Sequence, residues 1–244
     1  MPRFFVSPDK VGEENISVTG DDARHIARAL RLAVGDEITV SDGEGTDFFC
    51  RLLRIRDEEC TAEIISRAPS VAEPPLEITL YMAYPKADKL EIVVQKAVEL
   101  GASVIVPFES QRCIKRPAAE RAEKIGARLQ RIAVEAAKQC GRGRLPSVLG
   151  AVSFDALVRR MDVDTPVLFC YEGGGTMPIK EVLDQMEMPK KLGVIVGSEG
   201  GFSPDEAERL ISAGAIPVGL GPRILRCETA PAYALSAISY KFEL

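Results

Sequence analysis

The sequence predicts an α/β protein in which a small β domain precedes a larger domain with a parallel sheet. Three observations lead to this fold class. Short alternating apolar stretches fill the part before residue 66, three prolines interrupt the pattern at residues 66–75, and strand and helix patterns then alternate to the end. Such alternation is typical of parallel strands covered by helices. We therefore expect two domains, residues 1–72 and residues 73–244.

The first domain is expected to be a small antiparallel β-barrel or sandwich. A helix interrupts its strands at residues 21–32, where Asp21 and Asp22 suit the positive N-terminal end. A DGEG turn separates the first two strand patterns. The three strand patterns are DEITVSD at 36–42, TDFFCRLLRIRD at 46–57 and CTAEIISR at 60–67.

The second domain has a clear strand and helix order. A helix is expected after its fourth strand, because Ser203 can cap it, Pro204 suits its first position and Glu206 completes a capping box. A long helix is expected at residues 118–139. The five apolar strand patterns lie at residues 76–84, 103–108, 166–171, 192–197 and 216–221.

Composition excludes several classes of protein. With 46% hydrophobic and 27% charged residues the chain is globular. The N-terminus lacks the apolar region of a signal peptide, and no apolar run is long enough for a bilayer, so we expect a cytoplasmic protein without a membrane segment. The six cysteines form no C-x-x-C pair and His25 is the only histidine, which argues against a metal site or a disulfide framework.

Charge is distributed unevenly along the chain. The net charge is −5, yet residues 86–144 contain 13 Lys or Arg against 7 Asp or Glu. Basic residues recur along one side of the expected helix at 118–139, and loop cations lie near both of its ends, which favours a track for RNA phosphates. In the first domain Arg24, Arg28 and Arg31 share a helical face. For both faces an ordinary solvated surface is the alternative.

Two glycine-marked turns follow predicted strands. The first, GSEGGFS at residues 197–203, matches neither a Walker loop nor a G-x-G-x-x-G turn, and Glu199 would repel a pyrophosphate. A ligand with hydroxyls, amines or positive charge, such as S-adenosylmethionine, suits it better. The second lies within residues 218–238, where Thr229 can cap a helix and Glu228 precedes it. Glycines that merely permit tight turns are the alternative, but two such turns favour a ligand at the carboxyl edge of the sheet.

These motifs carry a resemblance over essentially the whole chain. GSEGGFSPDEAERL and LGPRILRCETA, with KLEIVVQKAVELGASVIVPFESQRC upstream, resemble the RsmE family of the SPOUT superfamily. The resemblance implies an enzyme that uses S-adenosylmethionine to methylate N3 of a uridine in 16S ribosomal RNA of the small subunit. It also implies a PUA-like β-barrel for RNA at residues 1–72, a SPOUT α/β domain with a trefoil knot at residues 73–244, and a homodimer.

The resemblance also implies cofactor contacts, while the chemistry of the reaction indicates catalytic residues and the basic segments indicate RNA contacts. We expect Arg226 to stabilise the imide anion that forms when uridine N3 loses its proton, and Glu228 to accept that proton. An ion pair between these two side chains is the alternative. The expected cofactor contacts are Gly197, Glu199, Gly200, Gly201, Leu220, Gly221, Ile224, Leu225, Arg226, Glu228, Thr229 and Ala230. The expected RNA contacts are Arg3, Arg24, Arg28, Arg31, Lys86, Arg112, Lys115, Arg116, Lys138 and Arg142.

Two positions depart from the family pattern. Ser198 stands where proline is frequent, and Cys227 where threonine is frequent, so a hydrogen bond from position 227 is in question. Three other functions remain open. They are a SPOUT enzyme that acts on ribose 2′-hydroxyls or transfer RNA, a nucleotide-dependent oxidoreductase, and an RNA-binding assembly protein without catalysis. The CETAPAYALS ending and the absence of a dinucleotide turn disfavour the first two.

Overall fold

The structure, a computed structural model, describes residues 1–86, 88–113, 119–161 and 164–244. The chain divides into two compact units. One consists of Met1–Glu73 and Ala137–Leu145, the other of Pro74–Ala136 and Pro146–Leu244. The sequence-based division assigned every residue after 72 to the second domain. It therefore missed a nine-residue segment, Ala137–Leu145, that returns to the first unit.

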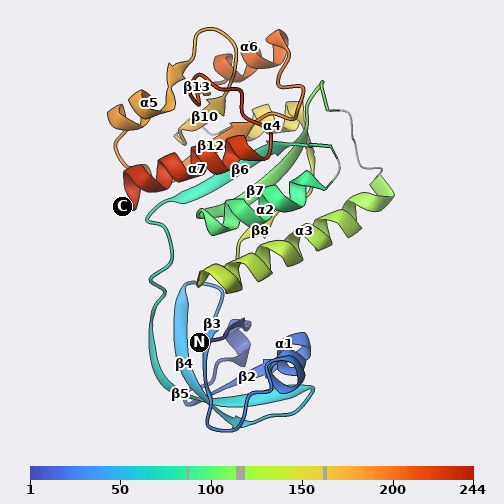
Figure 1. Ribbon diagram of the computed structural model, residues 1–244, viewed down its shortest axis with the longest axis vertical. Coiled ribbons are helices and arrows are strands. Elements are labelled where there is room, and N and C mark those ends of the chain that lie inside the picture. The colour runs from blue at the N-terminus through green and yellow to red at the C-terminus, as the bar shows by residue number, and fades with distance from the viewer. Residues whose placement is uncertain (87, 114–118, 162–163) are drawn as a thin grey trace. The chain divides into compact units, whose positions relative to one another are not determined.

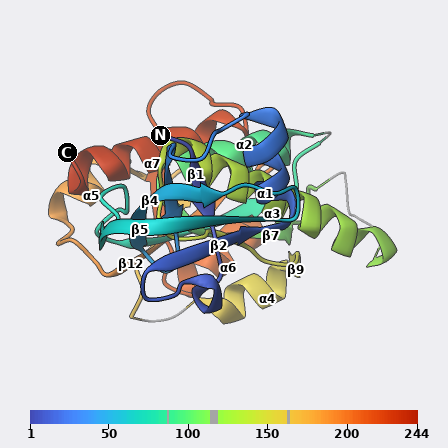
Figure 2. The same cartoon turned by 90° about the horizontal axis from the view of Figure 1, so that it is seen from below.

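A five-stranded sheet forms the first unit, in the order β1-β3-β4-β5-β2. The pair β1 and β3 is parallel and the other pairs are antiparallel, and Figure 2 shows β4, β5 and β2 side by side. Phe4, Ile16, Ile38 and Leu52 are buried in its core. The sheet is open in the described residues, so it is a partial barrel. Its strands are β1 (Arg3–Phe5), β2 (Asn15–Thr19), β3 (Glu37–Ser41), β4 (Thr46–Arg54) and β5 (Glu59–Pro69).

The helix predicted at residues 21–32 is shorter and irregular. The α-helix α1 (Gly20–Arg24) continues as a π-turn, η2 (His25–Ala29), in which the Leu30 amide bonds to the His25 carbonyl. Arg31 then adopts φ 51°, a left-handed conformation that ends the helix. The predicted common face of Arg24, Arg28 and Arg31 is therefore wrong at Arg31. A single-turn 3₁₀ helix, η1 (Pro8–Lys10), precedes β2.

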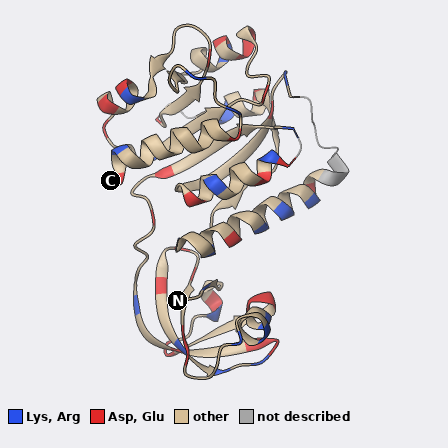
Figure 3. Ribbon diagram, in the orientation of Figure 1, with Lys and Arg blue, Asp and Glu red and all other residues tan. Residues whose placement is uncertain are grey.

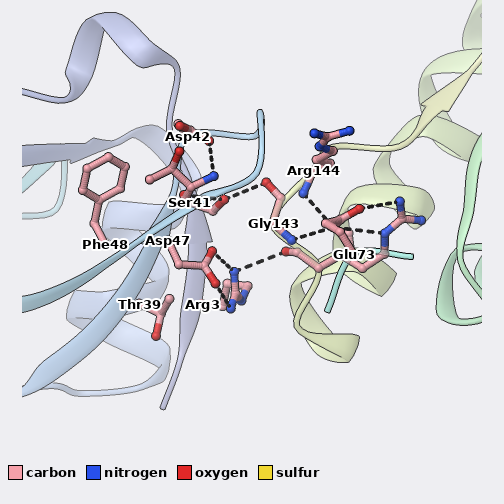
Figure 4. Close-up of polar contacts among 12 residues, drawn as sticks. Arg3, Thr39, Ser41, Asp42, Asp47, Phe48, Glu73, Gly143 and Arg144 are labelled. Carbon is pink, nitrogen blue, oxygen red and sulfur yellow. Dashed lines mark hydrogen bonds and ion pairs between the residues drawn. The ribbon is translucent and has the colours of Figure 1, made fainter. Parts of the chain in front are cut away.

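The segment Ala137–Leu145 is held in the first unit by a polar network (Figure 4). Glu73 accepts hydrogen bonds from the Arg142 guanidinium at 3.0 Å and from the amides of Gly143 and Arg144 at 2.8 and 2.9 Å. Ser41 Oγ donates to the Gly143 carbonyl at 2.7 Å. The partners lie about 70 to 100 residues apart in the chain, so no local sequence pattern could predict the assignment of this segment.

A parallel sheet forms the second unit, as predicted. Its order is β11-β13-β10-β12-β6-β7-β8, and β9 pairs with β7. All five predicted strands are present, whereas the two-residue strands β8, β9 and β11 are too short to give a pattern. The strands are β6 (Glu77–Ala83), β7 (Ala102–Glu109), β8 (Ser147–Val148), β9 (Val152–Ser153), β10 (Val167–Cys170), β11 (Met177–Pro178), β12 (Lys191–Val196) and β13 (Ile216–Gly219).

Helices connect these strands. In Figure 1, α2 and α7 lie side by side over one face of the sheet, and α7 also contacts β12 and α5. Among the described residues, no helix combines the length and apolar character that a membrane span requires. The helices are α2 (Lys89–Glu99), α3 (Ala119–Cys140), α4 (Phe154–Arg160), α5 (Ile179–Gln185), α6 (Pro204–Ser212) and α7 (Thr229–Phe242).

Of the two helix caps predicted from the sequence, one is confirmed and one is wrong. The capping box of α6 is confirmed, because Ser203 and Glu206 exchange both side-chain to backbone bonds. The predicted cap by Thr229 is wrong, because Thr229 is the first residue of α7 and Glu228 is the N-cap, without a side-chain bond. The amides of Thr229 and Ala230 bond instead to the carbonyl of Arg226, so the backbone closes this turn without the threonine hydroxyl.

Candidate active site

A cavity of about 600 Å³ lies where β10, β12 and β13 end. The loops that follow these three strands form its walls, together with Lys89 at the start of α2. The carboxyl ends of parallel strands meet at one edge of a sheet, which is where ligands bind in open α/β folds. Both glycine-marked turns of the sequence therefore border one cavity.

The turn after β12 depends on two glycines. Gly201 has φ +61° and its amide bonds to the Ser198 carbonyl at 2.9 Å, a left-handed position that favours glycine. At Gly197 a Cβ would lie 2.8 Å from the Phe202 ring, too close for any side chain. The Arg112 guanidinium donates to the Gly200 carbonyl at 3.0 Å. Gly197 and Gly201 border the cavity, where they have no side chain to separate the backbone from a ligand.

The turn after β13 contributes apolar and basic side chains. Leu220, Ile224, Leu225 and Arg226 border the cavity, and Ile224 is 87% exposed. Within the described part of the chain, no ion pair engages Arg226, so the alternative pairing of Arg226 with Glu228 is not present. The guanidinium is exposed beside the cavity, where a substrate can reach it.

Lys89 links the two turns and was missed by the sequence analysis. Its Nζ lies 3.0 Å from Oε1 of Glu199 and 3.2 Å from Oε2 of Glu228. The backbone N–H of Lys86 donates to both carboxylate oxygens of Glu199, at 3.1 and 3.2 Å. The Cys227 thiol donates to Oε2 of Glu228 at 3.2 Å. A hydrogen bond from position 227 is therefore present, made by a thiol.

Protonation in this cluster follows from its contacts. Burial works against ionisation of Glu199 and Glu228, but their hydrogen bonds to backbone amides and to Lys89 outweigh it and lower both pKa values. The bonds to Glu199 and Glu228 raise the pKa of Lys89. Burial, with the bond to Glu228, raises the pKa of Cys227 to about 12. Two carboxylates, an ammonium and a neutral thiol are therefore present at pH 7.

Most of the predicted cofactor residues border the cavity. Gly200, Glu228 and Thr229 do not. The loop after β10 was missed, although its strand was predicted and ends at the same edge. That loop adds Tyr171, Glu172 and Thr176, and Cys170 at the end of β10 also borders the cavity. The predicted residues that do border the cavity are Gly197, Glu199, Gly201, Leu220, Gly221, Ile224, Leu225, Arg226 and Ala230.

Several predicted RNA contacts of the first unit are occupied within that unit. Arg142 is 2% exposed and paired with Glu73, so its guanidinium has no surface for RNA. Arg3 is largely buried and paired with Asp47. The remaining pairs are Lys138 with Asp22, Arg28 with Asp57 and Arg24 with Asp21.

Exposure distinguishes the predicted RNA contacts that remain at the surface. The side chains of Arg24, Arg28 and Arg31 are exposed, as are Lys86 and Arg112 of the second unit. Lys115 and Arg116 lie outside the described residues. In the described part of the chain, no cluster of His, Cys, Asp and Glu side chains has the makings of a metal site.

Comparisons with known proteins identify the family. An RNA methyltransferase domain model matches residues 72–239, and an RNA methyltransferase PUA domain model matches residues 18–65. The ribosomal RNA small subunit methyltransferase E of Bacillus subtilis is 34% identical over 100% of this chain and 98% of its own length. The chain belongs to the ribosomal RNA small subunit methyltransferase E family. The resemblance drawn from the sequence motifs is confirmed.

Other members of the methyltransferase E family are similar to this chain over almost its full length. The methyltransferase E of Neisseria gonorrhoeae, in a crystal structure bound to S-adenosyl methionine, is 32% identical with a TM-score of 0.88. The match covers 98% of this chain and 97% of that one. The methyltransferase E of Synechocystis is 32% identical over 99% of this chain and 78% of its own length. The predicted PUA-like and α/β domains therefore match this family in sequence and fold.

Proposed function

We propose that this chain uses S-adenosylmethionine to methylate N3 of one uridine in the 16S ribosomal RNA of the small ribosomal subunit. The observation that carries the proposal is the single cavity bordered by both glycine turns, in a chain of the methyltransferase E family. A relative of the same fold is bound to this cofactor.

The cavity suits the cofactor in size and chemistry. About 600 Å³ lies within the range of small-molecule sites. The Glu199 carboxylate complements a positively charged ligand, and backbone groups of the glycine turns can bond to ribose and adenine. Leu220 and Leu225 offer apolar contact to a base. The proposed cofactor residues are those predicted from the sequence, with Gly200, Glu228 and Thr229 acting from outside the cavity wall.

The chain's own side chains would activate the base. The bound cofactor supplies a methyl group on a sulfonium. Uridine N3 must lose its proton to become nucleophilic, and the exposed Arg226 can stabilise the negative charge on the flanking carbonyls. Glu228 is ionised and lies two residues from Arg226, so we assign it as the proton acceptor, although its lowered pKa makes it a weak base.

RNA contacts are proposed on the exposed cations alone. Figure 3 shows Lys and Arg recurring along α3, where Lys124 and Arg131 are exposed. Arg24, Arg28, Arg31, Lys86 and Arg112 remain candidates for phosphate contact. Ion pairs within the first unit instead engage Arg3, Lys138 and Arg142.

We also propose a knotted second domain and a homodimer. A trefoil knot is supported by the path of the chain, because β13 is separated from β12 by β10 in the sheet while α7 returns to contact β12 and α2. A homodimer is supported by large apolar groups that α7 leaves exposed, Tyr233 and Tyr240. A ribosomal substrate would place the reaction in the cytoplasm.

Methyl transfer to ribosomal subunits tests the function. Small subunits from a strain that lacks the gene are incubated with the purified chain and labelled cofactor, and the RNA is then reverse transcribed. Methyl at N3 removes the Watson–Crick donor, so we expect incorporation of label and a new stop at one uridine. Label without a stop would indicate methylation that leaves the Watson–Crick edge intact, such as at a ribose 2′-hydroxyl. RNA binding without label would indicate an assembly protein.

A further inference from the structure

Lys89 occupies the first position of α2, where a positive charge is electrostatically unfavourable. The amino end of a helix carries partial positive charge and favours carboxylates. Asp88, the N-cap residue, makes no side-chain cap bond that would offset this. The role of the ammonium must therefore be sought outside its own helix.

Two carboxylates from different loops surround this ammonium. Glu199 follows β12, Glu228 follows β13, and Lys89 Nζ lies 3.0 and 3.2 Å from them. In the sheet β10 separates β12 from β13, so no strand pairing holds their loops against each other. The side chains of Lys89, Glu199 and Glu228 are only 30%, 26% and 20% exposed, which shields the pairs from solvent more than typical surface pairs.

The cluster also sets the charge beside the cavity. One ammonium and two carboxylates leave one net negative charge, and without Lys89 there would be two. Lys89 and Glu199 border the cavity themselves. S-adenosylmethionine carries a positive sulfonium, whereas the sulfur of its product S-adenosylhomocysteine is neutral. The charge of the cluster therefore affects the two ligands differently.

We propose that Lys89 is a positioning residue of the methyl-transfer site, which ties the two cofactor loops together and offsets one of the two negative charges beside the cavity. This inference rests on the proposed function. A more negative cavity would hold the charged cofactor more tightly relative to the neutral product and to the less charged transition state, which would slow the transfer. Lys89 limits that effect while it holds the loops in place.

Calorimetric titration of the full-length chain with S-adenosylmethionine and with S-adenosylhomocysteine tests the inference. In Lys89→Met we expect both ligands to bind about tenfold more weakly because the loops separate. The loss should be about threefold larger for the product, because the remaining carboxylates favour the sulfonium. Lys89→Arg should restore most of the binding. Lys96→Met is the matched control, since Lys96 lies on the same helix and pairs only locally with Glu99.

Glu228→Gln should change the preference between the two ligands in the opposite direction. It leaves α2 unchanged, so it can be used if Lys89→Met does not fold. It removes one negative charge, so the preference for the cofactor over the product should fall instead of rise. Two results would overturn the inference alone. One is an unchanged affinity for both ligands in Lys89→Met. The other is an equal loss of affinity for both ligands in Lys89→Met together with an unchanged preference for the cofactor in Glu228→Gln. A wild-type chain that binds neither ligand would overturn the proposed function as well.

Discussion

At the scale of single residues, Ser198 and Ser203 show how a hydrogen-bond partner decides the effect of a buried hydroxyl on stability. Both side chains are buried in the same loop. Ser203 Oγ accepts the amide of Glu206 at 3.2 Å and caps α6. Ser198 Oγ has no hydrogen-bond partner among the described residues. A buried hydroxyl without a hydrogen-bond partner destabilises the folded state, whereas a hydroxyl that caps a helix stabilises it.

Alanine substitutions at these serines should therefore have opposite effects. Ser198→Ala should raise the free energy of unfolding by up to about 1 kcal/mol, because it removes an unsatisfied group. Ser203→Ala, the matched control, should lower it by about 1 kcal/mol. Urea unfolding followed by circular dichroism measures both. A loss of stability in Ser198→Ala would mean that its hydroxyl has a partner, such as a buried water.

Arg226 should affect turnover more than cofactor binding. If it stabilises the imide anion, Arg226→Ala should lower the rate constant of transfer by about 10² to 10³, as for loss of an oxyanion-hole donor, and should lower cofactor affinity far less. Single-turnover kinetics and calorimetry separate the two. Lys241→Ala is the control, since Lys241 lies on α7 and pairs with Asp184. Normal turnover in Arg226→Ala would remove this residue from the mechanism.

At the scale of elements, ion pairs connect segments that the sheet does not join. Lys89 joins the loops that follow β12 and β13. Glu73, in the segment between β5 and β6, joins that segment to Ala137–Leu145. Both connections use partly buried carboxylates, which are costly to leave unpaired.

Acid should weaken the Lys89 connection. The folded pKa values of Glu199 and Glu228 are lowered, so their contribution to stability is present above the ordinary value of 4.5 and is lost as pH falls through the lowered values. In Lys89→Met these carboxylates have less reason to stay ionised. Its unfolding free energy should therefore fall less below pH 4.5 than that of wild type, as measured by urea unfolding at several pH values. Parallel pH curves would contradict this.

Removing Glu73 should destabilise the first unit strongly. Glu73→Ala takes the carboxylate from the buried Arg142 guanidinium and from the amides of Gly143 and Arg144, at a cost of about 3 to 5 kcal/mol. Glu37→Ala is the matched control, because Glu37 pairs with Arg51 on an exposed surface and should cost less than about 1 kcal/mol. Thermal unfolding compares them, and equal small effects would contradict the assigned role of the network.

At the scale of the whole molecule, charge distribution matters more than net charge. The chain is acidic overall, yet Lys and Arg recur along α3 (Figure 3), where Lys124, Arg128 and Arg131 are exposed. Such a face can bind a polyanion, and the affinity falls as the salt concentration rises.

Salt dependence can therefore locate the RNA surface. Arg131→Gln should weaken binding to small-subunit RNA for all sequences and reduce the slope of log K against log salt by about 1. Lys191→Gln is the control, because Lys191 is exposed at the amino end of β12 and pairs with Glu77. Filter binding at several salt concentrations measures the slope. An unchanged slope in Arg131→Gln would exclude contact between α3 and phosphate at this residue.

The sequence by itself determined the strands β3 to β7, β10, β12 and β13, the α6 capping box and the two glycine turns, because these depend on local periodicity and turn chemistry. The family motifs extended this to most of the cavity wall. Only the tertiary structure decided which cations are free, since Arg3, Lys138 and Arg142 pair with carboxylates far away in the chain. It also decided the place of Lys89 and of the segment Ala137–Leu145, because their partners are brought together by folding and leave no mark in local sequence.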